Sequence, residues 1–223
     1  AGQSAVGDIF NWFVNKIQPG EKLSHEELNT LASEISPGAS GLISLDWNNG
    51  NRSILIDSNL SGLTIGTTLS TTPAEIYRSL IESTAFGARI IIDRLRDYDV
   101  NIERIINCGG IAEKSPLLMQ IYADVLNCEM EISSNPQSCA LGVAIAAAVV
   151  GNVYENFNDA IDSMTKLDDK KYFPNKKNKE IYDQLFLLYK QLHDAFGTNN
   201  TEIKLNNVMK DLINIRKQVR AGE

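Results

Sequence analysis

A strand, a glycine pair and a helix start follow one another in the middle of the chain and constrain the fold more than any other stretch. Residues 104–108 have an apolar Ile-Ile centre, which predicts a short buried strand. Gly109 and Gly110 then allow a sharp turn and leave no side chain in the way of a ligand. Ser115 and Pro116 predict a helix start, because a hydroxyl N-cap followed by proline suits the first turn. The free N–H groups at such a helix end favour an anion, phosphate above all.

The glycine pair alone leaves the function open. Its spacing matches neither a P-loop nor the dinucleotide fingerprint. A glycine pair between a strand and a helix is more often a plain tight turn, and one alternative is therefore an α/β domain in which these glycines bind nothing.

Capping residues and hydrophobic periodicity predict the other elements. Thr72 to Glu75 is the clearest helix start, and its apolar positions continue to about Tyr98. Ser24 to Glu27 predicts a second capping box, with a helix through Ile35. Periodicity adds helices near 9–17, 116–125, 140–150, 156–164, 178–196 and 208–219, and strands near 41–47, 63–65 and 129–132. Short strands separated by long helices indicate an α/β fold, with a sheet that carries helices on its faces.

Several residues carry expectations about burial. Residues 140–150 are apolar on every side, which predicts a helix buried on both sides. His25 and His193 stand in polar helical contexts that favour the surface. Asp46 and Asp57 each stand alone in sequence, so a turn-capping or solvated role is expected for both. Glu82, which lies among small residues that allow close helix packing, is assigned a structural role unless it is buried.

Cysteine usage and charge limit the classes of partner. Cys108, Cys128 and Cys139 have no C-x-x-C and no metal-ligand spacing, which favours buried thiols in a reducing compartment. The net charge is −7 and no basic block is present, so nucleic acid and anionic membrane are poor candidates as partners. The longest apolar run is shorter than the ~20 residues of a membrane span, and a cytoplasmic location is expected.

Four blocks in this order resemble the C-terminal, actin-like domain of the FGGY carbohydrate kinases, and bacterial L-ribulokinases in particular. The blocks are residues 1–10, 72–87, 107–124 and 139–144. The resemblance implies an actin-like (ribonuclease H-like) α/β fold, a mixed sheet with helices on both faces. It also implies a nucleotide-binding domain over 1–197, followed by a C-terminal helical tail over 198–223.

The resemblance implies ATP-dependent phosphorylation of a sugar hydroxyl, with MgATP and sugar held between two domains. Gly109 and Gly110 take positions that pack against the adenosine, and Gly2 takes one that approaches the phosphates. Lys114 falls near a position beside the adenine that is usually Asn in glycerol kinases. Val6 falls where glycerol kinases often have Gln, so no nucleotide contact is assigned to it.

The same resemblance places the catalytic base, the sugar contacts and the acidic residues near Mg²⁺ in an N-terminal sugar-binding domain that this chain lacks. The chain starts without Met, and we interpret it as a fragment. We therefore expect no catalytic residue and no metal ligand here, an inactive fragment, and self-association into a homo-oligomer through the exposed domain interface. The alternatives are another FGGY kinase, for xylulose, gluconate or glycerol, and a non-catalytic actin-like nucleotide switch.

Overall fold

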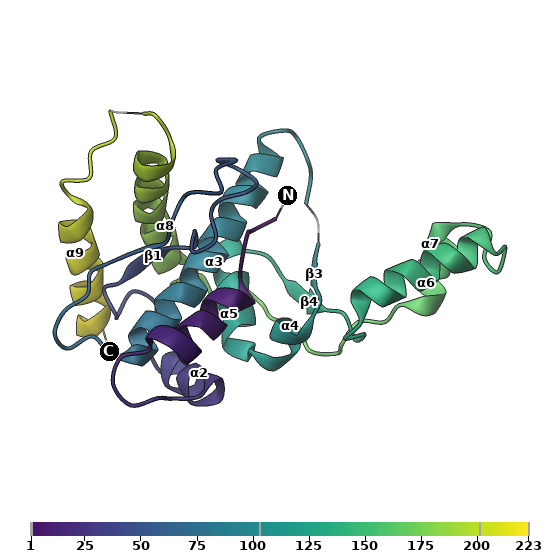
Figure 1. Cartoon of the computed structure of the whole chain (residues 1–223), viewed down its shortest axis with the longest axis horizontal. Helices are drawn as coiled ribbons and strands as arrows, with labels where there is room; N and C mark the ends of the chain where they lie inside the picture. The colour runs from purple at the N-terminus through teal and green to yellow at the C-terminus, as the bar shows by residue number, and fades with distance from the viewer. Residues whose placement is uncertain (1, 103, 201, 223) are drawn as a thin grey trace.

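The computed structural model describes residues 2–102, 104–200 and 202–222, which form a compact body and a projecting arm (Figure 1). The helices are α1 (Gly7–Trp12), the π-helix η1 (Phe13–Ile17), α2 (His25–Ser33), α3 (Pro73–Arg96), α4 (Gly110–Lys114), α5 (Pro116–Leu126), α6 (Ser138–Val150), α7 (Phe157–Met164), α8 (Lys176–Gly197) and α9 (Val208–Ala221). The strands are β1 (Ile43–Leu45), β2 (Leu63–Ile65), β3 (Ile105–Asn107) and β4 (Met130–Ile132). None of these described helices combines the length and apolar character needed to cross a membrane.

The long helix α3 is the centre of the body and contacts α1, α2, α5, α8 and β1 (Figure 1). It begins with the predicted capping box, because the Thr72 side chain accepts a hydrogen bond from Glu75 N and the Glu75 side chain accepts one from Thr72 N. The capping box predicted at Ser24 is likewise present at the start of α2. Both helix starts are thereby confirmed.

The strands form two pairs. β1 and β2 are antiparallel, with Ile43 opposite Ile65, and β3 and β4 are parallel, with Ile105 opposite Met130. α4 and α5 connect β3 to β4, so this part of the chain is a β–α–β unit of the kind that the α/β prediction requires. The turn at Gly109 follows β3 with a φ of +93°, a left-handed value that favours glycine.

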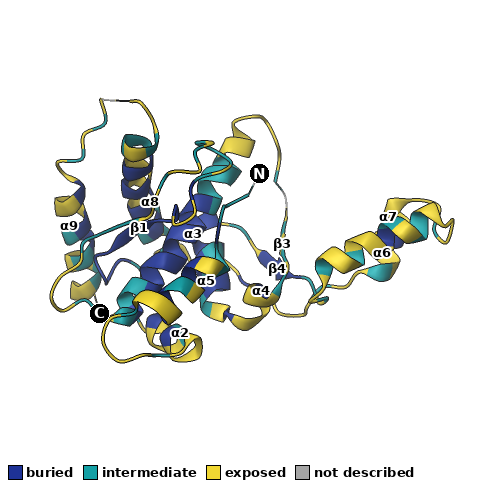
Figure 2. Ribbon diagram, in the orientation of Figure 1, coloured by how far each residue is buried: buried dark blue, intermediate teal, exposed yellow. Residues whose placement is uncertain are grey.

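The expectation that residues 140–150 are buried on both sides is wrong. Ile145 is the one buried residue of α6, whereas the Val143 side chain is 72% exposed. The physical reason is that among the described elements α6 packs mainly against α7, and both helices project from the body as an arm (Figure 2). The buried strand expected at 104–108 also needs correction, since Ile106 of β3 is 48% exposed.

Two further burial expectations are wrong, those for the cysteine thiols and for His193. Cys108 and Cys139 are exposed, and Cys128 is partly exposed. His193 is buried, because α8 packs across the end of β1 and brings the imidazole within 5.3 Å of the Trp47 ring centroid. His25 is exposed, as expected.

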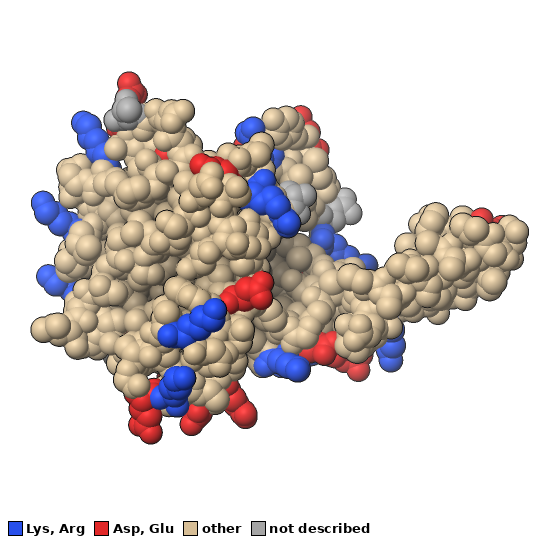
Figure 3. Space-filling view, viewed as in Figure 1, with Lys and Arg blue, Asp and Glu red and all other residues tan. Residues whose placement is uncertain are grey.

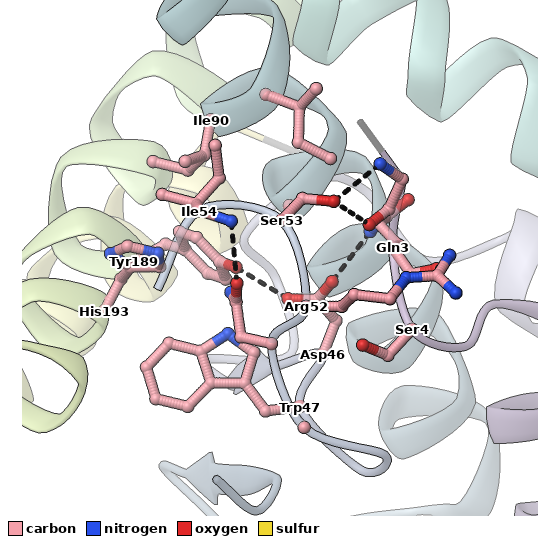
Figure 4. Close-up of a pocket in the computed structure, with 15 residues that line it drawn as sticks. Gln3, Ser4, Asp46, Trp47, Arg52, Ser53, Ile54, Ile90, Tyr189 and His193 are labelled. Carbon is pink, nitrogen blue, oxygen red and sulfur yellow. Dashed lines mark hydrogen bonds between the residues drawn. The ribbon is translucent and has the colours of Figure 1, made fainter. Parts of the chain in front are cut away.

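Of the two aspartates expected at turns, one is buried and one is not. Asp57 does cap a turn, accepting a hydrogen bond from Asn59 N at 2.8 Å. Asp46 is instead buried and accepts one hydrogen bond from the Tyr189 hydroxyl and one from Gln3 Nε2, each at 2.7 Å (Figure 4). Burial raises the pKa of Asp46, and these two hydrogen bonds offset part of that increase.

The Asp46 cluster depends on a close backbone approach from α3. A Cβ on Gly87 would lie 2.3 Å from Asp46 Oδ2 and 2.6 Å from Gln3 Nε2. Gln3 Nε2 also donates to the carbonyl of Thr84 at 2.8 Å. Because position 87 of α3 is a glycine, three segments can meet over the helix: the first residues of the chain, the segment after β1, and α8.

Candidate ligand-binding cleft

A cleft of about 850 Å³ opens between α2 on one side and α4 with the start of α5 on the other. Its volume lies in the range of small-molecule sites, roughly 300–1,000 Å³. The lining residues are Gly7, Phe10, Asn11, His25, Glu26, Asn29, Thr30, Ser33, Tyr77, Ile81, Gly110, Ile111, Lys114, Ser115, Pro116, Leu117 and Leu118. On the face shown in Figure 3, acidic and basic side chains are scattered and form no large region of one sign.

The floor of the cleft is formed by buried, mostly apolar side chains. Phe10, Tyr77 and Ile81 line it, and each is almost fully buried in the body. The rings of Phe10 and Tyr77 lie with their centroids 5.8 Å apart in a tilted pair. Burial raises the pKa of the Tyr77 phenol, so this side chain stays neutral at physiological pH. Such a floor suits a flat ring system rather than a charged group.

A chain of hydrogen bonds across the cleft ties its two walls together. The Ser115 hydroxyl donates to Asn29 Oδ1 at 2.8 Å and so joins the start of α5 to α2. Asn29 Nδ2 in turn donates to the Tyr77 hydroxyl at 3.3 Å and to the carbonyl of His25 at 2.8 Å. His25 Nδ1 lies 3.2 Å from the same hydroxyl. The separation of the walls is thus set by side chains that already have partners.

The structure places the four predicted site residues in different surroundings. Gly110 and Lys114 line the cleft, and Gly109 directly precedes Gly110 as the N-cap of α4. A Cβ on Gly109 or Gly110 would meet no atom within 4 Å, so the space beside both is open. Gly2 is not brought together with these residues. It lines a separate cavity of about 20 Å³ near Asp46, room for about one water molecule (Figure 4).

Sequence reasoning missed the contribution of the first helix to the cleft. Gly7 and Asn11, four residues apart on one face of α1, line it opposite Gly110 and Lys114, which have the same spacing on α4. A Cβ on Gly7 would lie 2.6 Å from Cδ1 of Ile111, so a small residue lets the two short helices approach. The spacing of four places each pair on one helix face, but nothing in the sequence indicates that these two faces meet.

The cleft does not have the composition of a metal site. Glu26 is the one carboxylate among its lining residues. Within the described parts of the chain, no group of three or more His, Cys, Asp or Glu residues is placed to hold a metal ion. A divalent ion that accompanies a bound molecule here would need coordinating groups from elsewhere.

Replacing Ser115 with alanine is expected to destabilise the chain by about 1 kcal/mol, because its hydroxyl also caps α5 by accepting from Leu118 N at 3.2 Å. The same change leaves Asn29 Oδ1 without its donor and loosens the cleft. Urea denaturation followed by circular dichroism measures the loss. Ser115→Thr keeps the hydroxyl and is the matched control, and an equal loss in both variants would contradict this role.

Comparison with known proteins identifies the family. The model of the FGGY family of carbohydrate kinases, C-terminal domain, matches residues 1–150. The chain is 46% identical to a ribulokinase of Bacillus licheniformis over 95% of this chain and 40% of that protein. It is 44% identical to a ribulokinase of Geobacillus thermodenitrificans over all of this chain and 41% of that protein. The chain thus spans about two fifths of the length of these curated relatives.

Solved structures agree with the fold. A gluconate kinase of Lactobacillus acidophilus superimposes with a TM-score of 0.76 at 24% identity, over 89% of this chain and 39% of that one. A xylulose kinase of Rhodospirillum rubrum superimposes with a TM-score of 0.73 at 28% identity, over 86% of this chain and 38% of that one. The expected actin-like α/β fold is thereby confirmed. Because the family model matches residues 1–150, the chain belongs to the FGGY family of carbohydrate kinases.

Proposed function

We propose that this chain is the nucleotide-binding half of an ATP-dependent sugar kinase whose acceptor is L-ribulose. The observation that carries the nucleotide assignment is the cleft between α2 and α4, with its apolar floor and the open glycine at position 110. The acceptor follows from the relatives named ribulokinase, which match nearly the whole chain. In this proposal residues 1–197 form the nucleotide-binding domain and residues 198–223 form its tail. The protein is proposed to work in the cytoplasm.

In this proposal the cleft holds the adenosine part of the nucleotide. The base lies over Tyr77 and Phe10, where its flat ring replaces water on an apolar floor. Gly109 and Gly110 allow the adenosine to approach the backbone, and Lys114 stands beside it at the rim. Gly2, which lies at the cavity near Asp46, is proposed to approach the phosphates only with the longer protein in place.

The nucleotide enters as its Mg²⁺ complex in this proposal. The single carboxylate of the cleft, Glu26, is too little to hold the ion, so no step is assigned to Mg²⁺ on this chain. Phosphoryl transfer depends on positioning and on charges that surround the transferred group from both sides. The catalytic base and the sugar contacts are assigned to the remainder of the longer protein, and this chain alone is proposed to be inactive.

The acceptor is tested by assaying the longer protein that contains this chain. ADP release is measured with L-ribulose, xylulose, gluconate and glycerol at equal concentrations, and L-ribulose is expected to give the highest kcat/KM. The similarity to a xylulose kinase at 28% identity makes xylulose the second candidate. A higher kcat/KM for any other acceptor would overturn the ribulokinase assignment. Sugar-dependent ADP release by the 223-residue chain would overturn its proposed inactivity.

A further inference from the structure

We infer that the loop after β1, residues 46–53, is a clamp that sets where the rest of the longer protein meets this domain, and that Ser53 is a positioning residue for the reaction. The inference rests on the proposed function, in which a sugar-binding domain precedes this chain and shares the phosphoryl transfer with it. Three observations carry it: the hydrogen bonds that hold residues 2–4, the bracing of the loop, and the place of both on α3.

The Ser53 hydroxyl binds both backbone polar groups of Gly2. It accepts a hydrogen bond from Gly2 N at 2.7 Å and donates one to the carbonyl of Gly2 at 2.6 Å (Figure 4). A serine hydroxyl has one hydrogen to donate and lone pairs that accept, so Ser53 can make both bonds at once. Hydrogen bonds to the N–H and the carbonyl of one residue fix the position of the backbone there and the direction in which it runs.

The two residues that follow Gly2 are held by the same loop. Gln3 Nε2 donates to Asp46 Oδ2 at 2.7 Å, a short bond to a buried carboxyl group. Arg52 Nη2 donates to the carbonyl of Gln3 at 3.4 Å, and Asn49 Nδ2 donates to the carbonyl of Ser4, also at 3.4 Å. These last two bonds are long and therefore weak. The strong contacts are thus the ones made by Ser53 and Asp46.

The loop is braced by hydrogen bonds of its own. Asn51 and Asp57 exchange both of their backbone hydrogen bonds, at 2.8 and 2.9 Å. The Asn51 side chain also accepts from the backbone N–H groups three and four positions further on, at 3.3 and 3.1 Å. Gly50 has a φ of +74°, and a Cβ there would lie 2.7 Å from backbone atoms of Ser58, so the turn requires glycine. The position of Ser53 is therefore set by the loop itself.

The clamp lies on helix α3, which also supplies part of the floor of the cleft. The carbonyl of Thr84 accepts from Gln3 Nε2 at 2.8 Å, and Tyr77, which lines the cleft, lies about two turns earlier on the same helix. Gly7 lines the cleft as well and follows Gln3 by four residues, a separation of at most about 14 Å. The loop therefore fixes residues 2–4 relative to the proposed nucleotide site.

A clamp at this place matters for a reaction that two halves of a protein share. Misplacing reacting groups by about 1 Å can lower a rate by about a hundredfold. In the proposed function the polypeptide before Gly2 leads to the sugar-binding domain, and the clamp sets the point from which it departs. Ser53 then acts through the other half and touches no substrate. Its loss should lower kcat and leave the affinity for nucleotide unchanged.

Ser53→Ala in the longer protein is the direct test. With L-ribulose and MgATP, kcat is expected to fall about tenfold or more, while the KM for MgATP stays unchanged. Ser53→Thr keeps the hydroxyl and should restore most of kcat. Ser70→Ala is the matched control, because it removes a hydroxyl that shares a hydrogen bond with Thr68 Oγ1 in another loop. Wild-type kcat in Ser53→Ala, or equal losses in the Ala and Thr variants, would overturn the inference.

Hydrogen exchange gives a readout that does not depend on activity. In the longer protein, Ser53→Ala should speed amide exchange in a peptide that covers residues 2–6 by about tenfold or more, because the Gly2 amide loses its acceptor. Exchange over residues 111–118, at the wall of the cleft, should stay the same. Equal exchange over residues 2–6 in wild type and Ser53→Ala would overturn the clamp. A longer protein that phosphorylates no sugar would overturn the proposed function instead, and the exchange result would still decide whether the clamp exists.

Discussion

Replacing Glu82 with leucine is expected to destabilise the chain by about 3–5 kcal/mol, the range for removing one partner of a buried ion pair. Glu82 is buried inside α3 and its Oε1 accepts from Arg78 Nε at 2.8 Å and from the Tyr182 hydroxyl at 3.1 Å. Arg78 also donates to the carbonyl of Ala32 and to the Tyr182 hydroxyl, each at 2.8 Å. The cluster joins α3 to the end of α2 and to α8.

The cost arises from the guanidinium that remains. Burial by itself lowers the pKa of Arg78, but Tyr182 and Glu82 outweigh burial and raise it, so Arg78 stays charged. Without Glu82 that charge is buried with neutral partners only. Urea denaturation of the 223-residue chain measures the change in the free energy of unfolding.

The double variant Arg78→Leu with Glu82→Leu is the control. Replacing both partners of a buried pair by apolar groups is often nearly neutral, so the double variant should be more stable than Glu82→Leu alone. A double variant that is less stable than the single one would show that the pair acts through something other than charge compensation.

Replacing Gly110 with valine is expected to weaken nucleotide binding by about tenfold or more, equivalent to about 1.4 kcal/mol, while the fold persists. The position tolerates a side chain in the free protein, because a Cβ there would meet no atom within 4 Å. The new side chain would instead fill the part of the cleft where the proposed adenosine approaches the backbone. Titration with MgADP, followed by NMR chemical shifts, measures the dissociation constant.

Gly142→Val provides the matched control for this variant. Gly142 also lies in a helix with open space around its Cβ, but it belongs to the arm and not to the cleft. Its substitution should leave the MgADP titration unchanged. Wild-type affinity in a folded Gly110→Val variant would place the nucleotide elsewhere and support the alternative that the glycine pair is a turn only.

The sequence predicts those elements whose determinants are local. The starts of α2 and α3 were predictable because a capping box satisfies the first turn of a helix with residues three positions apart. The burial of His193 and the exposure of α6 were not, since each depends on which distant segment packs against the helix. His193 is covered by Trp47, from the loop after β1 and far away in the sequence, and among the described elements α6 packs mainly against α7.

The residues of the candidate site divide in the same way, into those that the sequence predicted and those that a distant contact brings to the cleft. Gly110 was predicted from the glycine turn and Lys114 from the family resemblance, and both line the cleft. Gly7 and Asn11 reach it only because α1 approaches α4, a contact between segments about a hundred residues apart that no local pattern encodes. Gly2 lies apart because its N–H donates to Ser53 Oγ at 2.7 Å, which fixes it against the loop after β1.

Helix α3 supplies Tyr77 and Ile81 to the floor of the cleft, and it also holds the Arg78–Glu82 pair and the glycine that admits Asp46. These features therefore share one unfolding unit, and Tyr77 and Ile81 can become mobile only when that unit opens. A ligand on this floor meets groups whose conformational entropy was lost during folding, so binding need not remove it again. The entropic cost of binding then falls on the rim, on Asn11, Glu26 and Lys114, whose side chains are exposed in the free protein.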